Sequence, residues 1–222
     1  MKALRSYFRR LTPARVRRMC LGVLLIGAAV ACYRLSLFGV DAFTCMNLGV
    51  SGFVHVGFGT WQLLVNLCIL VFVFFLGREN IGLGTVMNMV FVGYIADFLC
   101  WLVLEKLGLH AALPGRIAFL AAGSLLAALG CALYMAAELG VSPYDSVAIL
   151  LEKQSKGRLP FRAARVLSDV TCVVIGVGFC LLGKNALQEI VGLGTILNAL
   201  FNGPLIQFFK GLLDRKPTSA RT

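Results

Sequence analysis

Apolar residues in this chain gather in long runs that short polar or turn-forming segments separate. Six runs approach or exceed the roughly 20 residues that an α-helix needs to cross a 30 Å hydrocarbon core. They cover about 19–38, 60–77, 82–104, 116–137, 162–182 and 190–212. The pattern predicts an all-α polytopic membrane protein with six transmembrane helices.

Two of these runs share a motif. Residues 82–98 read GLGTVMNMVFVGYIADF and residues 192–208 read GLGTILNALFNGPLIQF, at a constant offset of 110 positions with eight identities. Chance does not place so many identities, three of them glycine, at one fixed offset. The chain therefore contains an internal repeat, and the repeat sets its architecture.

Each copy of the repeat holds three predicted spans, over residues 19–110 and 111–213. Because three is odd, the second copy enters the membrane from the side opposite to the first. This predicts two inverted three-helix repeats related by a pseudo-two-fold axis in the membrane plane, an arrangement common among secondary transporters. Basic segments, 1–18 and 214–222, flank the repeats.

Composition and charge agree with a membrane protein and orient it. Apolar residues make up 59% of the chain and charged residues 14%, against about 45–50% and 25% in soluble domains. With both termini inside, the inner segments hold 17 of the 21 Lys and Arg residues: seven in 1–18, Arg78, five in 153–165 and four in 210–221. The positive-inside rule then predicts that both termini are cytoplasmic. The basic N-terminal flank is expected to meet anionic lipids rather than nucleic acid.

An apolar segment too short to span follows the first helix of each repeat. In the second repeat, Ser142-Pro143-Tyr144-Asp145 has the form of a helix start, with Ser142 as N-cap and proline at N1. That helix is expected to run to about Ser155. In the first repeat, Asp41 is the expected cap of a helix over 41–48. Helices this short and apolar are typical of re-entrant or interfacial elements.

These features together resemble one family. The doubled G-x-G-T-x-x-N motif, the three-span repeat and the L-G-V-S-P-Y-D segment at 139–145 are similar to the bacterial YczE/YitT-type integral membrane proteins. The resemblance covers nearly the whole chain after the N-terminal flank and implies a fold and a location, not an activity. The first repeat departs from the family at Asp41-Ala42-Phe43, where a proline is expected at the second position.

Polar residues inside predicted spans are costly and are therefore candidates for function. Asn88 and Asn198 are repeat-related and form either an interhelical hydrogen bond or part of a binding site. Asp97, whose repeat partner is Gln207, serves a proton or cation site or pairs with Arg34.

Glycine and proline positions carry further expectations. We expect Gly82, Gly84, Gly192 and Gly194 to allow close helix packing. Gly93 and its counterparts Gly203 and Pro204 are expected to break their helices, which would free carbonyls where transporters bind ions.

Charged positions outside the repeated motif add two expectations. Arg165 and Asp169, four residues apart, are expected to form an ion pair. The expected binding site at the two short helices contains Asp41, Ser142 and Asp145, and its two carboxylates favour a cationic or neutral solute over an anion. The alternative is that they only cap surface helices.

The sequence thus favours a small transporter or permease. The alternative is a non-transporting membrane scaffold or regulatory protein. Neither enzyme motifs nor metal-ligand spacings occur, and the eight cysteines lie mostly in apolar runs. We therefore expect no enzyme activity, no cofactor and no metal.

Overall fold

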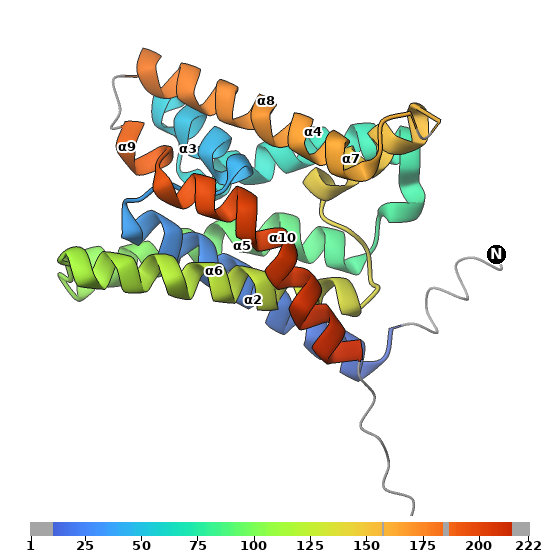
Figure 1. The fold of residues 1–222 in the computed structure, drawn as a ribbon, viewed down its shortest axis with the longest axis horizontal. Helices are drawn as coiled ribbons and strands as arrows, with labels where there is room; N and C mark the ends of the chain where they lie inside the picture. Colours follow the sequence, from blue (N-terminus) through green and yellow to red (C-terminus); the bar gives the residue numbers. More distant parts are fainter. Residues whose placement is uncertain (1–10, 157, 184–186, 215–222) are drawn as a thin grey trace, which may run out of the picture.

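The computed structural model describes residues 11–156, 158–183 and 187–214, and within these ranges it contains helices and turns but no strand (Figure 1). The helices are α2 (Pro13–Ser36), α3 (Ala42–Val54), α4 (Phe58–Gly77), the 3₁₀ turn η1 (Arg78–Asn80), α5 (Leu83–Trp101), the π-helical turn η2 (Leu102–Lys106), α6 (Leu113–Ala136), α7 (Pro143–Gln154), α8 (Phe161–Leu182), α9 (Leu187–Ile190) and α10 (Leu193–Asp214). The all-α prediction is confirmed for these residues. Helix α2 begins inside the segment 1–18 that the sequence assigns to the flank.

Among the residues that the structure describes, five helices are long and apolar enough to cross a membrane: α2, α4 with η1, α5 with η2, α6, and Ala163–Leu182 of α8. The sixth predicted span coincides with α10, which has 22 residues. Asn198, Asn202, Gln207 and Lys210 lower its apolar character, and α10 is not among the five.

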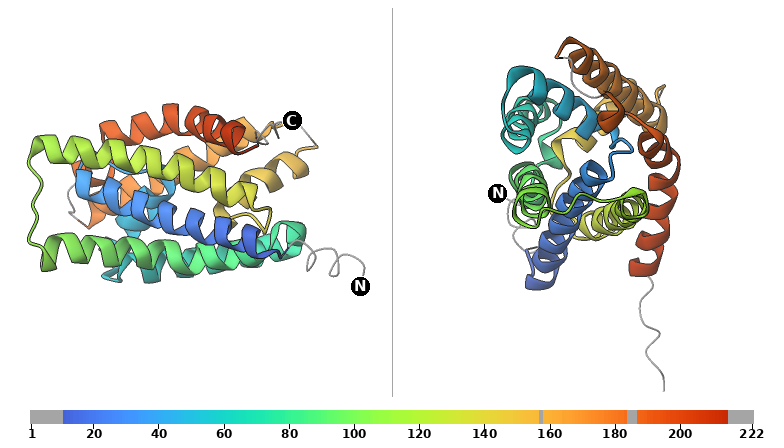
Figure 2. Two further views of the ribbon diagram at one scale, coloured as in Figure 1. Left: turned by 90° about the horizontal axis from the view of Figure 1, so that it is seen from below. Right: turned by 90° about the vertical axis from the view of Figure 1, so that its left-hand side faces the viewer.

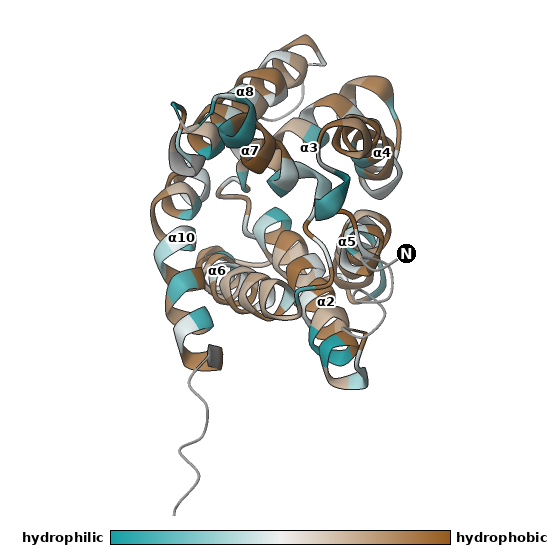
Figure 3. Ribbon diagram, turned by 90° about the vertical axis from the view of Figure 1, so that its right-hand side faces the viewer, coloured by the Kyte–Doolittle hydropathy of each residue, from teal (hydrophilic) through white to brown (hydrophobic). Residues whose placement is uncertain are grey.

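The outer surface of the helices is strongly apolar. Large hydrophobic side chains such as Phe72 and Phe75 on α4 and Val174 and Leu182 on α8 are more than half exposed. Figure 3 shows hydrophilic stretches at the start of α2, around α7 and along α10, on helices that are otherwise hydrophobic. A surface of this kind is stable in lipid rather than in water.

The long helices run in alternating directions. Figures 1 and 2 show α2, α5 and α8 leading away from the end of the bundle that holds residues 13 and 214, here called the terminal end, and α4, α6 and α10 leading back to it. At the centre, α2 and α6 are antiparallel and closely packed. A Cβ placed on Gly22 would lie 2.8 Å from the Gly130 carbonyl oxygen, so the glycines permit this approach.

The start of α5 and the start of α10 each receive a loop from the other half of the chain. The Gly84 amide donates to the Leu139 carbonyl at 2.8 Å, and the Gly194 amide donates to the Phe38 carbonyl at 2.7 Å. Gly84 and Gly194 therefore do allow close packing, and their backbone partners are the loops before α7 and α3, with the α6 side chains Tyr134 and Leu120 beside them.

The repeated threonine bonds the helix start in both copies and, in the first copy, also bonds the docked loop. The Thr85 hydroxyl donates to the Val141 carbonyl at 2.7 Å and accepts from the Gly82 amide at 3.0 Å. In the other copy the Thr195 hydroxyl accepts from the Gly192 amide at 3.3 Å. The G-x-G-T motif is thus a docking element for an irregular loop.

Two expectations about helix continuity were wrong. Helix α5 runs without interruption through Gly93, which instead meets α4: a Cβ there would lie 2.8 Å from the Gly59 Cα. Helix α10 continues through Pro204, since the loss of one internal hydrogen bond does not end a helix that lipid and its neighbours hold. Helix α3 is also longer than the expected 41–48.

The docking contacts predict that larger side chains at Gly84 and Gly194 lower the stability of the protein. Leucine at either position would push a side chain into a loop backbone, since a Cβ at Gly84 lies 3.2 Å from the Leu139 carbonyl oxygen and one at Gly194 lies 2.8 Å from that of Gly39. We expect Gly84→Leu and Gly194→Leu each to lower stability by about 1–3 kcal/mol or more, seen as a lower melting temperature in detergent.

Gly178→Leu on α8 is the matched control, because no described atom outside the adjoining helix backbone lies within 4 Å of a Cβ at that position. It should leave the melting temperature unchanged or raise it, since leucine is the better helix former. Equal melting of all three variants and the wild type would show that the docking glycines are not needed.

Candidate functional site

The N-terminal ends of the two short helices meet in the interior. Figure 1 shows α3 leading from the middle of the bundle to the end opposite the chain termini, and α7 leading from the middle to the terminal end. Their first turns touch through Phe43 and Tyr144, whose rings stack with centroids 4.5 Å apart. This contact brings two helix N-termini, each with a partial positive charge and unpaired amides, to one place.

Both helix starts are capped as the sequence predicts. The Asp41 carboxylate accepts from the Thr44 amide at 3.1 Å. The Ser142 hydroxyl accepts from the Asp145 amide at 3.1 Å and donates to the Asp145 carboxylate at 2.7 Å. Proline occupies N1 of α7. Ser142 and Asp145 thus combine a capping role with a place next to the stacked rings.

A charged cluster lies beside Tyr144. Arg165 on α8 forms ion pairs with Asp145 and with Asp169, the latter at 3.4 Å, and its guanidinium lies 4.6 Å from the centre of the Tyr144 ring. The Tyr144 hydroxyl donates to Asp169 at 2.5 Å. The predicted pair of Arg165 and Asp169 is confirmed. The roles of Tyr144 and of Asp145 as a second partner were missed, although a tyrosine and two carboxylates near one arginine in apolar segments are a usable signal.

The first half of the chain carries a neutral version of this cluster. Helices α4 and α8 both begin with phenylalanine. Counted from these starts, Gln62 and Asn66 occupy the positions of Arg165 and Asp169. Both are almost fully buried, and among the described residues Gln62 Oε1 and Asn66 Nδ2 have no hydrogen-bond partner. The phenylalanine ring at Phe43 offers them no hydroxyl, in contrast to the tyrosine on the other side.

Asp97 lies away from this centre and is fully engaged. Its carboxylate accepts from Arg34 at 2.6 Å and from the Gly59 amide at 2.6 Å, in the first turn of α4. Arg34 also lies over the Phe58 ring at 4.8 Å. Of the two roles that the sequence leaves open for Asp97, the geometry matches the ion pair with Arg34, with the added task of capping α4.

The remaining predicted site residues are dispersed. Asn88 is half-buried on α5. Asn198 is buried in a groove between α6 and α10, whereas Gln207 is exposed on α10. The structure therefore brings together Asp41, Ser142 and Asp145, and it does not bring Asp97, Asn88, Asn198 or Gln207 to them. Within the described residues, no three His, Cys, Asp or Glu side chains are placed to hold a metal ion.

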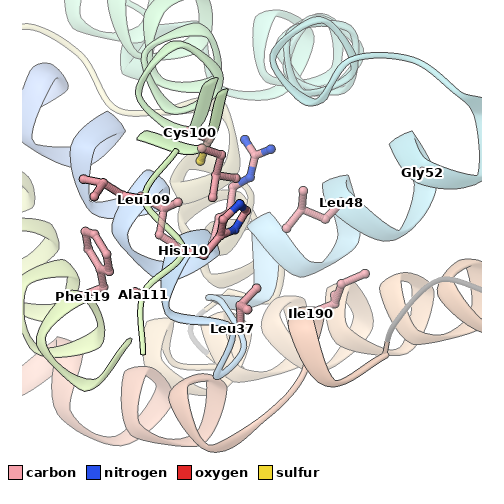
Figure 4. Close-up of a pocket in the computed structure, with 12 residues that line it drawn as sticks. Leu37, Leu48, Gly52, Cys100, Leu109, His110, Ala111, Phe119 and Ile190 are labelled. Atoms are coloured by element: carbon pink, nitrogen blue, oxygen red, sulfur yellow. The ribbon is translucent and has the colours of Figure 1, made fainter. Parts of the chain in front are cut away.

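A cavity of about 400 Å³ lies towards the end opposite the termini. Its lining includes Arg34, Leu48, Gly52, His110 and Ile190, from four different parts of the chain. Figure 4 shows His110 next to Leu37, with Leu48 and Gly52 on the neighbouring helix α3. A volume of this size is within the range of small-molecule sites.

Known proteins resemble this chain along most of its length. The family described as "Family of unknown function (DUF6198)" matches residues 13–211. "Uncharacterized protein YyaS" of Bacillus subtilis (strain 168) is 23% identical over 195 residues, covering 88% of this chain and 92% of that protein. An "Uncharacterized protein" of Haemophilus influenzae is 30% identical over 183 residues, covering 82% and 77%.

The "Uncharacterized membrane protein YczE" of Bacillus subtilis (strain 168) is 26% identical over 158 residues, covering 70% of this chain and 67% of that protein. The resemblance to YczE-type proteins found in the sequence is thereby confirmed. No solved structure matches the chain.

The charged cluster predicts a specific pattern of stabilities. Arg165→Gln leaves Asp145 and Asp169 without their base. Because about a third of the Arg165 and Asp169 side chains is exposed, we expect a loss of about 1–3 kcal/mol, less than for a fully buried pair. The double variant Arg165→Gln/Asp169→Asn copies the neutral pair of the first half and should recover part of this loss.

Thermal melting in detergent measures both variants. A single variant as stable as the wild type would mean that the cluster contributes no stability. A double variant no better than the single one would assign the loss to Asp145 alone.

Proposed function

The chain belongs to the DUF6198 family of membrane proteins, and on that premise we propose that it is a small inverted-repeat permease for a small cationic or neutral solute. It would have six spans and act in the bacterial cytoplasmic membrane. The observation that carries the proposal is the meeting of two capped helix N-termini, from α3 and α7, inside the bundle.

Paired backbone features support the inverted repeat. Residues in the left-handed region recur at an offset of 101: Leu37 with Glu138, Gly39 with Gly140, and His55 with Lys156. The stacked rings, Phe43 and Tyr144, have the same offset, as expected for a contact on a pseudo-two-fold axis. The reciprocal docking of each loop on the helix start of the other half fits the same relation.

The alternating helix directions support six spans with α10 as the last (Figure 2). In that topology residues 152–165 and both termini are cytoplasmic, as the distribution of basic residues favours. Arg17 and Arg18, exposed at the start of α2, would contact anionic lipid head groups there.

Single-cysteine labelling tests the topology. In a background without the eight native cysteines, all of them free thiols, Lys156→Cys should react with a membrane-impermeant maleimide only after the cells are opened. Leu109→Cys, in the connection at the other end of the bundle, should react in intact cells. Labelling of Lys156→Cys from outside intact cells would contradict the proposed orientation.

The charges around the helix N-termini set the solute class. Asp41, Asp145 and Asp169 supply three carboxylates against the single guanidinium of Arg165. The centre therefore has excess negative charge, which repels an anion and attracts a cation. Unpaired amide groups of Gln62 and Asn66 offer hydrogen bonds to a neutral or cationic solute nearby.

The two ends of the bundle differ in a way that suits alternating access. The cavity lies towards the opposite end. At the terminal end, ion pairs join the two halves: Arg15 to Glu138 at 3.2 Å and Lys153 to Glu79 at 2.5 Å. Exposed ion pairs contribute about 0–1 kcal/mol each, so these pairs add little to the cost of opening this end.

Solute uptake into proteoliposomes tests the proposal. Methylammonium, guanidinium and urea serve as cationic and neutral probes and acetate as the anion, each with and without a proton gradient. We expect uptake of at least one cationic or neutral probe by the wild type, and its loss in Asp145→Asn, which removes the charge next to Arg165. Ser142→Ala should cost about 0.5–2 kcal/mol of stability through the lost cap.

Glu105→Gln, in η2 and exposed, is the control and should transport normally. If Asp145→Asn remains folded with full uptake, the short helices are structural and the site must be sought at Asp97 and Asn88. Uptake of none of the probes by folded wild-type protein would favour the scaffold function.

A further inference from the structure

A second pocket, of about 320 Å³, lies between α6 and α10, away from the short helices. Four residues of each helix line it: Ile117, Leu120, Ala121 and Ser124 on α6, and Leu197, Asn198, Phe201 and Asn202 on α10. Ile117 and Phe201 at its rim are more than half exposed. The pocket therefore opens sideways, where a membrane protein meets lipid.

Unpaired amides line this otherwise apolar pocket. Asn198 is 6% exposed, and neither its oxygen nor its nitrogen has a hydrogen-bond partner among the described residues. The same holds for the side-chain oxygen of Asn202. Unpaired amides are costly in a medium without water, so an occupant that bonds them would be stabilised.

The corresponding place in the first half is solid core. By the repeat offset, Asn202 corresponds to Val92. When α2 and α6 are aligned so that Tyr33 matches Tyr134, the residue equivalent to Ser124 is Val23. Val92 and Val23 are 3% and 2% exposed and belong to one hydrophobic cluster. The second half thus has polar groups and a cavity at the place that apolar side chains fill in the first half.

We propose that this pocket binds a bilayer lipid that carries a free hydroxyl group, with its acyl chain along the apolar walls. A hydroxyl both donates and accepts, which matches an amide oxygen and nitrogen left unpaired together. Because Asn198 is nearly covered, a second helix lying across the groove does not reach it, whereas an inserted chain does. The pocket lies within the first half of α6 and of α10, towards the end opposite the termini, so the lipid enters from that leaflet. The site stands whether or not the protein transports a solute.

Two probes with the same acyl chain test the site: 1-monooleoylglycerol, which has free hydroxyls, and methyl oleate, which has none. Native mass spectrometry of the delipidated full-length protein in detergent measures binding of each. We expect the wild type to bind monooleoylglycerol about tenfold more tightly than methyl oleate, since buried hydrogen bonds distinguish them. Asn198→Leu/Asn202→Val, which removes the unpaired amides from the pocket, should lose this preference.

Ala121→Trp fills the pocket but keeps both asparagines, and it should reduce binding of both probes. Asn88→Leu, at the position repeat-related to Asn198, is the matched control and should bind like the wild type. Equal binding of the two probes by the wild type would overturn the proposal, as would a preserved preference in the double variant. A wild-type dimer that forms without either probe and is lost in the double variant would also overturn it, because the amides would then serve a second copy.

Discussion

The need to satisfy backbone hydrogen bonds in a medium without water governs this structure. Each short helix is preceded by an irregular loop, 37–41 or 137–142. The carbonyls of Phe38 and Leu139 and the amides of Val40 and Val141 take their partners from outside these loops. The starts of α10 and α5 supply those partners: Gly194 and Gly84 donate to the loops, and the loop residues Val40 and Val141 donate in turn to the carbonyls of Ile190 and Asn80. Backbone outside regular secondary structure is stable at membrane depth only where other protein groups form its hydrogen bonds in this way. The two copies of the G-x-G-T motif therefore bind the two loops, and the loops fix the positions of the two short helices.

That dependence explains which features the sequence predicts well. Caps and docking motifs are local, so Asp41, Ser142 and the glycines at 84 and 194 are recognisable from neighbours a few positions away. The pair of Arg165 and Asp169 is likewise four residues apart on one helix. Each involves a residue type with one strong local preference.

The features that the sequence does not predict arise between distant segments. The sequence around Asp145 does not predict its ion pair with Arg165, twenty residues further along, because the two residues meet only when α7 folds back against α8. The role of Gly93 cannot be predicted from its own position, because glycine permits either a helix bend or a close helix contact. In the structure Gly59 of α4 packs against Gly93, so its role is the close contact. Gln62 and Asn66 stand out only after α4 is aligned with α8. Asp97 becomes a cap of α4 because the fold brings the Gly59 amide to it, 38 positions away in sequence.

The two halves share a backbone plan but not a chemistry, and the differences are concentrated at a few paired positions. In the alignment of the two halves, Tyr144 corresponds to Phe43, Arg165 to Gln62, and Asn202 to Val92. In a strictly symmetric bundle a solute near the axis would meet the same groups from either half, and neither end would be favoured. Here the second half carries charge at positions where the first half carries neutral amides, while exposed ion pairs join the halves at the terminal end. Buried side chains of both halves, among them Met19, Val23, Tyr134 and Leu139, pack together at that same end. The difference between the halves therefore lies in a few polar side chains, whereas buried apolar packing and the docked loops hold the two halves together.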